Sequence, residues 1–382
     1  MKKGFLLVGV FLSLCIITSR AQSNPSHLRI SIITCTPGNE LYSIFGHTAL
    51  RITDSIQNTD LIYNYGTFDF ADPDFFTKFV RGKLNYFLSA EELPMFLYEY
   101  QLTNRAVTEQ ELLLSDSSKK AIQKAVVDNL VGNNRFYKYD FLYDNCTSRV
   151  KNILVKYAGM TVAKKLVAEG TSFRDMIHEY LDRGGMAWTK LGMDILLGSP
   201  SDKAVSIDES MFLPDYLMKG IDSSVSITQP LLMEKRSILT STIPGNSSST
   251  NWPFYFFTGI AAALLLLSFS ENHRAKFITR LIDFLLFCIT GLIGVFLLFT
   301  WFGTDHSSFA CNYNLLWALP TNIFAAAALW RNPRWLSTYF RVCSVIYLLL
   351  LACFFWLPQQ LNEAFIPLVI LLGFRSQKLA KK

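Results

Sequence analysis

The chain has 382 residues, of which 51% are hydrophobic and 14% aromatic, and its mean hydropathy is +0.25. These values are too apolar for an ordinary soluble protein and too mixed for a bundle of membrane helices alone, so the composition has to differ along the chain. The formal net charge of +6 does not require a nucleic-acid partner, because much of the basic excess lies in short loops between apolar segments near the C-terminus.

The N-terminus has the pattern of a secretory signal. It reads MKKGFLLVGVFLSLCIITSRAQS, with a basic start, an apolar core and small residues near Ser19 and Ala21. A lipoprotein signal around Cys15 is disfavoured, because Leu14 occupies the position where lipid attachment requires a small residue. We therefore expect a signal peptide over residues 1–21, cleaved after Ala21, and an exported mature chain.

Residues 22–240 mix polar and apolar residues and are enough for one domain. A strand is predicted over HLRISIITC, ended by Pro37 and Gly38, because β-branched residues are enriched there. Further strands are predicted from His47 to Ile52, over DLIYNYGTFDF, and once within residues 83–112. Together they predict a small antiparallel sheet.

Helices are predicted in the rest of this domain. DPDFFTKFVRG begins with Asp-Pro, which is typical of a helix start. A long amphipathic helix is expected from Glu109 to Leu130, with a break at Ser115, and helical spacing recurs over 146–158, 171–183 and 186–197. The exported domain is therefore expected to be α+β.

After a tether rich in Ser, Thr and Asn at 241–251, the chain becomes almost continuously apolar. About 20 apolar residues in a helix cross a bilayer. We therefore expect an all-α transmembrane domain over 252–376, followed by a basic cytoplasmic tail over 377–382. Its five expected spans are 252–270, 281–301, 313–330, 342–358 and 363–374.

Charged residues in the loops predict the orientation. Lys and Arg cluster after the first and third expected spans and at the C-terminus, whereas the loops near 302–312 and 359–363 have none. Because positively charged loops stay in the cytoplasm, residues 22–251 are expected in the periplasm, outside the inner membrane.

Three of the seven cysteines, Cys35, Cys146 and Cys311, are expected on the exported side. An odd number in an oxidising compartment points to a free reactive thiol or an intermolecular partner, and the sequence leaves open whether Cys35 and Cys311 pair. Cys146 begins CTSRVKNILVKYAG, which has helical spacing and ends at Gly159. At a helix N-terminus the dipole lowers the pKa of a thiol, and free amides can hold an oxyanion.

His47 is the histidine best placed to activate this thiol. It follows Gly46 at the start of a predicted strand, so its imidazole is held on a rigid element. A thiolate formed by a neighbouring imidazole is a nucleophile for acyl transfer. The alternative is that Cys146 is a small buried apolar residue, as a lone cysteine more often is. Its polar neighbours Asn145 and Thr147, the helix start and the strand histidine raise the catalytic interpretation only to an equal footing with it.

Several segments resemble one family. They are PGNELYSIFGHTALRI, YNYGTFDF, KFVRGKLNYFLS, YDFLYDNCTSRVKNIL, LLGSPSDK and FLPDYL. Together they are similar to the exported domain of the Lnb-type lipoprotein N-acyltransferases, and DHSSFACNYNLLWALPTN is similar to that family's membrane-proximal segment. A strand His followed by Asn-Cys at a helix start also resembles, more distantly, the permuted papain-like fold of the lecithin:retinol acyltransferase group and NlpC-type proteins. The resemblance implies a permuted papain-like periplasmic domain ahead of the transmembrane bundle.

The same resemblance implies roles for particular residues. Cys146 would be the nucleophile and His47 the base. The group that orients the imidazole is left between Asn64 and Tyr65, on the strand expected beside His47. Asn145, which precedes the nucleophile, is expected to contact substrate.

Three other polar residues are candidates for binding substrate. Arg51 would share the strand face of His47 and is a candidate to bind a phosphate or carboxylate, although an ordinary surface salt bridge is the favoured interpretation. His306 and Asn312 lie in the outer loop between the second and third spans, where polar side chains usually face a cavity or a partner. For these two the alternative is an interfacial loop with satisfied polar groups.

The implied reaction is an acyl transfer in two steps. The Cys146 thiolate would take a fatty acyl chain from a lipoprotein diacylglyceryl group or a phospholipid, and the thioester would pass it to the α-amine of the lipoprotein's first cysteine. The expected partners are thus a lipoprotein and membrane lipid. No metal, nucleotide or redox cofactor is expected, because the sequence has no Gly-rich phosphate loop, HExxH or CxxC.

Two other classes of function stay open at the level of sequence. A papain-like cell-wall peptidase or amidase would use the same Cys146 and His47, although five spans and a short tether favour a lipid substrate. A non-catalytic membrane assembly protein would leave Cys146 with a structural role alone.

Overall fold

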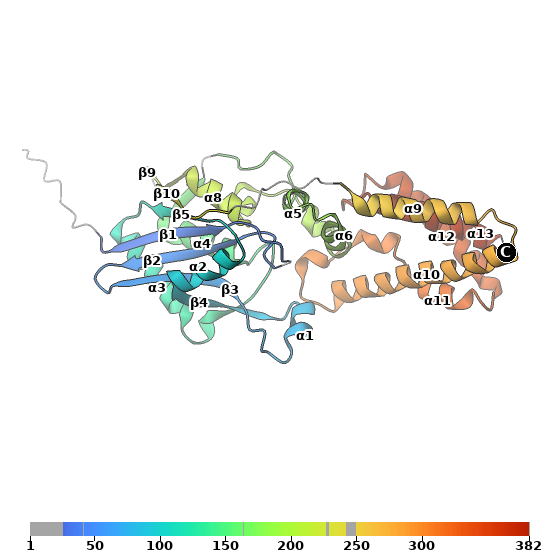
Figure 1. The fold of residues 1–382 in the computed structure, drawn as a ribbon, viewed down its shortest axis with the longest axis horizontal. Coiled ribbons are helices and arrows are strands. Elements are labelled where there is room, and N and C mark those ends of the chain that lie inside the picture. Colours follow the sequence, from blue (N-terminus) through green and yellow to red (C-terminus); the bar gives the residue numbers. More distant parts are fainter. Residues whose placement is uncertain (1–25, 41, 163, 227–228, 242–249, 382) are drawn as a thin grey trace, which may run out of the picture.

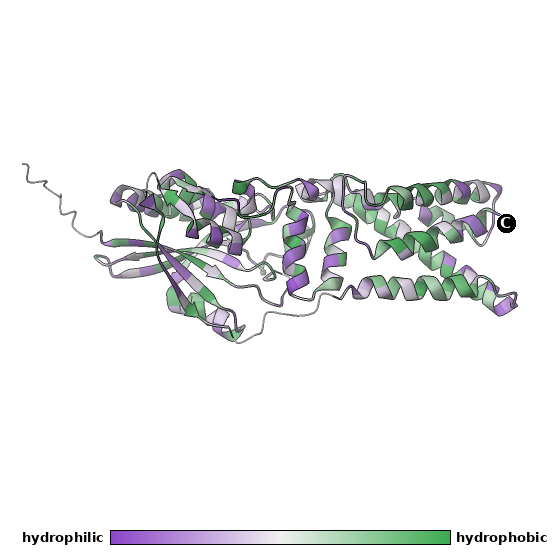
Figure 2. Ribbon diagram, turned by 90° about the horizontal axis from the view of Figure 1, so that it is seen from above, coloured by the Kyte–Doolittle hydropathy of each residue, from purple (hydrophilic) through white to green (hydrophobic). Residues whose placement is uncertain are grey.

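The computed structural model describes residues 26–40, 42–162, 164–226, 229–241 and 250–381. The signal peptide expected over 1–21 and most of the tether expected over 241–251 lie outside the described residues. The described chain forms an α+β N-terminal domain and a helical C-terminal region, placed end to end (Figure 1). Figure 2 shows apolar residues along the helices of the C-terminal region, whereas polar and apolar residues alternate in the N-terminal domain.

A seven-stranded sheet with the order β10-β5-β1-β2-β3-β4-β6 forms the centre of the N-terminal domain. All neighbouring strands in it are antiparallel. The strands are β1 (Leu28–Cys35), β2 (His47–Asp54), β3 (Thr59–Thr67), β4 (Asn85–Glu92), β5 (Val107–Leu112), β6 (Phe136–Lys138) and β10 (Leu232–Leu239). The first three lie where the sequence predicts strands, but the sheet is larger than expected.

The prediction of a helix from Glu109 to Leu130 is wrong over its first part. Residues 107–112 form β5 and pair with β1 and β10, so tertiary pairing overrides the local helical spacing. Helix α3 (Asp116–Leu130) begins after the expected break at Ser115, whose side chain accepts a hydrogen bond from the backbone N–H of Ser118.

Helices cover both faces of the sheet. Alternate residues of β1 divide between two cores: Ile32 packs with α3 and with α4 (Cys146–Ala158), and Ile33 packs with α2 (Leu93–Leu102). The helices predicted at 171–183 and 186–197 are confirmed as α5 (Phe173–Arg183) and α6 (Ala187–Leu196). Shorter elements complete the domain: α1 (Phe75–Val80), α7 (Ile207–Ser210), α8 (Pro214–Asp222), β7 (Met160–Val162), β8 (Ser224–Ser226) and β9 (Gln229–Pro230).

The C-terminal region is helical. It contains α9 (Trp252–Leu267), α10 (His273–Phe302), α11 (Asn322–Ala328), α12 (Arg334–Cys353) and α13 (Phe365–Ala380). Among the described residues, α10 and α12 are long and apolar enough to cross a membrane. The span expected at 313–330 is not one helix, because a 3-10 turn over Tyr313–Leu316 and the break at Pro320 leave only seven residues for α11.

The two parts are joined by a polar interface. The backbone N–H of Gly198 donates to the carbonyl of Ser308 at 2.8 Å, and the side chain of Asn314 donates to the carbonyl of Asp194 at 2.8 Å. The Asp194 carboxylate, 1% exposed, also binds Arg174 and the amide of Asn362. Such buried polar groups favour one arrangement, because separating the two parts would remove the hydrogen bond that Asn362 donates to the Asp194 carboxylate.

Candidate functional site

Cys146 is the first residue of α4, as the sequence predicts. The helix begins here because Asn145 and Ser148 form a capping box, in which the Asn145 side chain accepts from the Ser148 N–H and the Ser148 side chain accepts from the Asn145 N–H. The helix ends at Gly159, whose φ of 64° lies in the left-handed region. The thiol therefore lies at the positive end of a 13-residue helix.

The imidazole of His47 lies against this thiol. Gly46 turns the chain into β2 with a φ of 79°, and a Cβ there would lie 2.6 Å from the carbonyl oxygen of Cys35. His47 Nε2 lies 2.7 Å from the side-chain oxygen of Asn64. The ring also lies close enough to the Cys146 thiol for each group to shift the pKa of the other, and Cys146 Cβ and His47 Cε1 both border Gly66. Because an amide oxygen only accepts, Nε2 carries the proton and Nδ1 is left to act as the base toward sulfur.

Each member of this pair changes the proton affinity of the other. Burial raises the pKa of the Cys146 thiol, but the charge and hydrogen bond of His47 and the backbone N–H of Thr48 outweigh it and lower that pKa to about 7. Burial lowers the pKa of His47, but the Cys146 thiolate and the Asn64 hydrogen bond outweigh it and raise that pKa. The arrangement favours a thiolate and imidazolium pair.

The two candidates for orienting His47 lie on opposite faces of β3. Asn64 contacts the imidazole, whereas the Tyr65 hydroxyl accepts a hydrogen bond from Asn129 at 2.8 Å within the core beneath α3. Strand alternation explains the difference, because consecutive side chains point to opposite faces of a sheet. Asn64 is thus the partner of His47, and Tyr65 is buried away from it.

Gly66 borders the site, although the sequence indicates only an interruption of the strand there. Its φ is 95°, and a Cβ built on it would lie 3.6 Å from Cys146 Cβ and 3.9 Å from His47 Cε1. The missing side chain leaves space beside both reacting groups. The sequence signal for this role is the position of Gly66 in YNYG, two residues after Asn64 and therefore on the same face of the strand.

The start of α4 supplies candidate donors for an oxyanion. An α-helix leaves its first amides without intrahelical acceptors. The Asn145 side chain already accepts a hydrogen bond from the backbone amide of Ser148. The backbone amides of Cys146 and Thr147 are therefore the candidate donors to the oxyanion. A hydrogen bond of 3.1 Å between the hydroxyls of Thr48 and Thr147 ties this helix end to β2.

Two residues expected to contact substrate are engaged elsewhere. Asn145 is 3% exposed, and its side-chain amide donates to the carbonyls of Phe141 and Phe212. Arg51 binds Asp60 and the buried Glu109, which is the salt-bridge alternative. These contacts give Asn145 and Arg51 structural roles and do not support substrate binding by either.

The two outer-loop candidates lie at the interface between the two parts of the chain. Asn312 is 2% exposed and donates to the carbonyls of Ile195 and Leu196 at the end of α6. His306 follows α10, and its Nε2 lies 3.1 Å from the carbonyl oxygen of Phe79. Both residues bind protein rather than an open surface, so a contact with a lipid headgroup has no support from these positions.

The other two cysteines expected on the exported side differ from Cys146. Cys35 and Cys311 are both free, so they do not pair in this structure. Burial raises the pKa of Cys35 to about 12, the opposite direction to Cys146, which leaves it a weak nucleophile. Cys311 is exposed in the interface loop.

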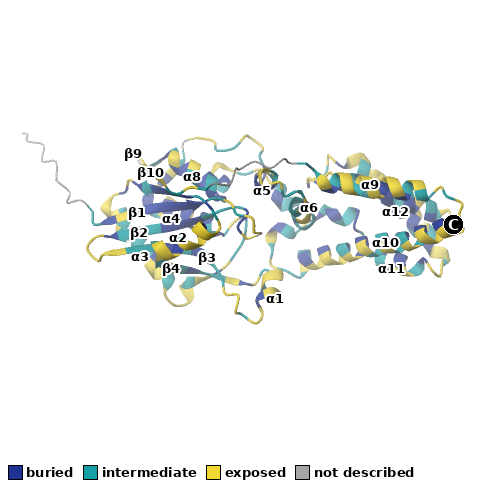
Figure 3. Ribbon diagram, viewed as in Figure 1, coloured by how far each residue is buried: buried dark blue, intermediate teal, exposed yellow. Residues whose placement is uncertain are grey.

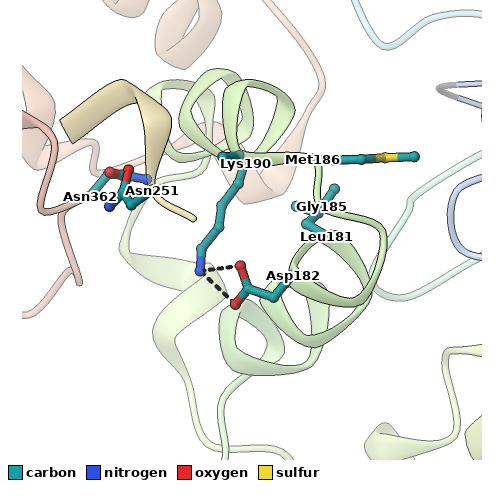
Figure 4. A pocket seen from close by; sticks show the side chains of 8 residues that line it. Leu181, Asp182, Gly185, Met186, Lys190, Asn251 and Asn362 are labelled. Carbon is teal, nitrogen blue, oxygen red and sulfur yellow. Dashed lines mark hydrogen bonds and ion pairs between the residues drawn. The ribbon is translucent and has the colours of Figure 1, made fainter. Parts of the chain in front are cut away.

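The cavity drawn in Figure 4 has a volume of about 170 Å³, and neither Cys146 nor His47 lines it. It is lined by residues of α5 and α6 together with Asn251 and Asn362, and Lys190 and Asp182 form an ion pair at 2.8 Å across it. Because its strongest charges neutralise each other and no reacting group lines it, we do not place the chemistry there.

Comparison with known families assigns both parts of the chain. A family model described as the Lnb N-terminal periplasmic domain matches residues 18–183, and one described as the Lnb transmembrane domain matches residues 245–381. The first match contains His47, Asn64 and Cys146. No curated protein and no solved structure matches the chain.

Proposed function

The chain belongs to the Lnb family, with a periplasmic domain ahead of the family's transmembrane domain in the inner membrane, and from this premise we propose that it is a thiol-dependent lipoprotein N-acyltransferase. The observation that carries the proposal is the contact between Cys146, at the start of α4, and His47, whose ring is held by Asn64. A nucleophile, a base and a group that orients the base are the parts of a thiol acyl-transfer site. The permuted papain-like fold is part of the same proposal.

The first half of the reaction acylates the enzyme. Nδ1 of His47 accepts the Cys146 proton, and the thiolate attacks the ester carbonyl of a diacylglyceryl group or phospholipid. The amides at the start of α4 stabilise the oxyanion. When the carbon–oxygen bond breaks, the imidazolium returns the proton to the departing alcohol, and the acyl chain stays on sulfur as a thioester.

The second half transfers the chain to nitrogen. The α-amine of the lipoprotein's N-terminal cysteine attacks the thioester carbonyl, and His47 accepts the proton that this nitrogen loses. The carbon–sulfur bond breaks, which releases the amide and restores the Cys146 thiolate. Water would compete with the amine at this stage, so the active site has to exclude it.

Anchoring to the membrane supports a lipid substrate. The periplasmic domain is fixed to the helical region by the hydrogen bonds that Asn314 and Asn362 donate to Asp194, in addition to the covalent connection. Both the acyl donor and a lipoprotein N-terminus are held in the membrane, so a docked domain meets them at a high effective concentration. A peptidase acting on the cell wall gains nothing from such docking.

Mass spectrometry of a lipoprotein N-terminus tests the proposal. A lipoprotein is expressed with this protein in cells that lack other N-acyltransferases, and the wild type is compared with Cys146→Ala and with Cys311→Ser, a matched change at an exposed free thiol. We expect N-acylated lipopeptide with the wild type and Cys311→Ser and none with Cys146→Ala. N-acylation that survives in Cys146→Ala, or is absent from the wild type, would contradict the proposal, and cleavage of muropeptides would favour the peptidase.

A further inference from the structure

An aromatic loop protrudes from the periplasmic domain. We use this name for residues 68–80, which run from the end of β3 through α1. Three phenylalanines on it are exposed: Phe70 at 69%, Phe76 at 79% and Phe79 at 48%. Figure 3 shows α1 as largely exposed at the end of the domain that adjoins the helical region. Clustered exposed rings are costly in water and usually mark a contact surface.

The aromatic loop is held at the outer end of a membrane helix. The carbonyl of Arg81 accepts a hydrogen bond of 2.9 Å from the Asp305 N–H, and the Phe79 carbonyl lies 3.1 Å from His306 Nε2. Helix α10 ends at Phe302, three residues before Asp305. At no more than about 3.6 Å per residue, the contact lies within roughly 11 Å of the end of this helix.

Other aromatic side chains place the membrane surface at the same level. Trp188 on α6 packs on Phe256 of α9 with ring centroids 5.4 Å apart, and Trp252 at the start of α9 is 64% exposed. Trp356, after α12, is 82% exposed. Aromatic residues collect in this way where a membrane meets water. The exposed Arg81 beside the loop suits the phosphates of that layer.

A row of rings runs from the aromatic loop toward Cys146. Phe70 and Phe75 pack on Phe68, and Phe68 packs on Tyr86 with centroids 5.3 Å apart. Tyr86 stacks on Tyr139 at 4.4 Å. Tyr139 and Cys146 both pack against the core between the sheet and helices α3 and α4. Burial raises the pKa of the Tyr139 hydroxyl, and the nearby charge of Cys146 raises it further.

We propose that the aromatic loop inserts into the outer leaflet of the inner membrane and that lipid acyl chains reach Cys146 along the rings of Phe68, Tyr86 and Tyr139. The insertion stands on the position and exposure of the loop alone. The path of the acyl chain rests on the proposed function. Gly66 lies two residues before Phe68 in the chain. Because it has no side chain, it leaves space beside the Cys146 thiol where the acyl chain would reach the reacting groups.

Photo-crosslinking of the full chain in lipid nanodiscs tests the insertion. Benzoylphenylalanine replaces Phe76 in one sample and Ile56 in another, since Ile56 is similarly exposed, at 76%, but lies in the turn between β2 and β3 at the other end of the sheet (Figure 1). With phosphatidylethanolamine and phosphatidylglycerol in the disc, we expect phospholipid adducts at position 76 and none at 56. A lack of adducts at 76, or equal yields at the two positions, would overturn the insertion.

Acyl transfer by variants tests the path. Losing the burial of a Phe side chain, about 1.5–3 kcal/mol, should lower the rate of lipoprotein N-acylation by about tenfold to a hundredfold in Phe76→Ser, whereas Ile56→Ser should leave it unchanged. Alkylation of Cys146 by iodoacetamide should stay at the wild-type rate in Phe76→Ser, which shows that the site itself is intact. If Phe76→Ser acylates at the wild-type rate, the path is refuted. Adducts at position 76 are expected in Cys146→Ala as well, so a failure of the proposed function is distinguishable from a failure of the insertion.

Discussion

At the scale of single residues, Cys146 and His47 set the pH at which the site is ready to react. The thiolate is the reactive form, and the pKa of Cys146 is lowered to about 7 from the ordinary 9.0. Alkylation of Cys146 by iodoacetamide should therefore be slow below pH 7 and rise through it. In His47→Ala the opposing burial remains, so we expect the midpoint to move above 9.0.

Peptide mass spectrometry measures this alkylation at each cysteine separately. The exposed Cys311 is the control, because its profile should be the same in the wild type and in His47→Ala. A midpoint that stays near 7 in His47→Ala would show that the imidazole does not ionise the thiol.

Asn64 should act through His47. In Asn64→Ala the Nε2 proton loses its acceptor and the pKa of His47 falls, so we expect kcat for N-acylation to drop by about tenfold to a hundredfold. Asn64→Asp keeps an acceptor and should recover part of the rate. The matched change Tyr65→Phe removes a hydroxyl that binds Asn129 on the other face, so it should cost about 1 kcal/mol of stability with kcat unchanged.

The pH profile of kcat/KM separates positioning from a loss of folding. A shift of its limbs in Asn64→Ala, with a melting temperature near that of the wild type, would support the positioning role. An unchanged profile and rate in Asn64→Ala would exclude it.

Cys146 and His47 are predictable from the sequence because local signals mark both, a helix start and a glycine before a strand. Asn64 and Tyr65 are not distinguishable in this way, since strand alternation assigns them to opposite faces without saying which face meets the thiol. The partners of Arg51 are not predictable either, because Glu109 is 58 residues away along the chain.

At the scale of elements, docking of the periplasmic domain depends on close backbone contact at Gly198. A Cβ built on Gly198 would lie 1.8 Å from the carbonyl oxygen of Ala310, so Gly198→Ala forces the two parts of the chain apart. Gly192, on α6 nearby, has nothing within 4 Å of such a Cβ. Gly192→Ala should be neutral or stabilise the helix by roughly 0.5–1 kcal/mol.

Limited proteolysis in detergent measures the docking. We expect faster cleavage between the two parts and a lower melting temperature in Gly198→Ala than in Gly192→Ala. Equal protection of the two variants would mean that the interface adapts to the added methyl group.

Elements with local signals were predicted well, and elements without them were not. Helix α5 follows Ser172, whose capping box with Asp175 is local, and its expected range is two residues longer than the observed one. Strand β10 was missed because its five central residues are exposed and its partner β5 lies more than a hundred residues earlier. Such pairing is decided by tertiary contacts that a local pattern does not contain.

At the scale of the whole molecule, a buried ion pair joins the helices of the C-terminal region. Arg375 on α13 binds both oxygens of Asp283 on α10, at 2.6 and 2.7 Å, and both side chains are nearly inaccessible. Asp283→Ala leaves the guanidinium without its carboxylate, which should cost about 3–5 kcal/mol.

Thermal unfolding of the full chain in detergent measures this cost. Glu271→Ala is the matched control, because Glu271 pairs with Lys276 in an exposed position, and little change is expected there. A melting temperature for Asp283→Ala equal to that of Glu271→Ala would show that the buried pair does not hold the helices together.

The sequence predicted the order of the two parts and the periplasmic position of the first, because hydropathy and loop charge are properties of whole segments. It did not predict that the loop after α10 is a docking surface. Asn314 and the carbonyl of Asp194 are 120 residues apart, and no periodicity connects them.

Strand β10 also constrains how the protein is made. It is the last strand of the sheet, and it brings Arg236 to the buried Glu109, whose other cation is Arg51 on β2. Helix α9 begins at Trp252, so the ribosome supplies this strand only about a dozen residues ahead of the first hydrophobic helix. The sheet is therefore completed in the periplasm only while the translocon is already receiving the anchor. A nascent chain released before residue 229 would present β5 as an open edge and leave Glu109 with Arg51 as its remaining cation.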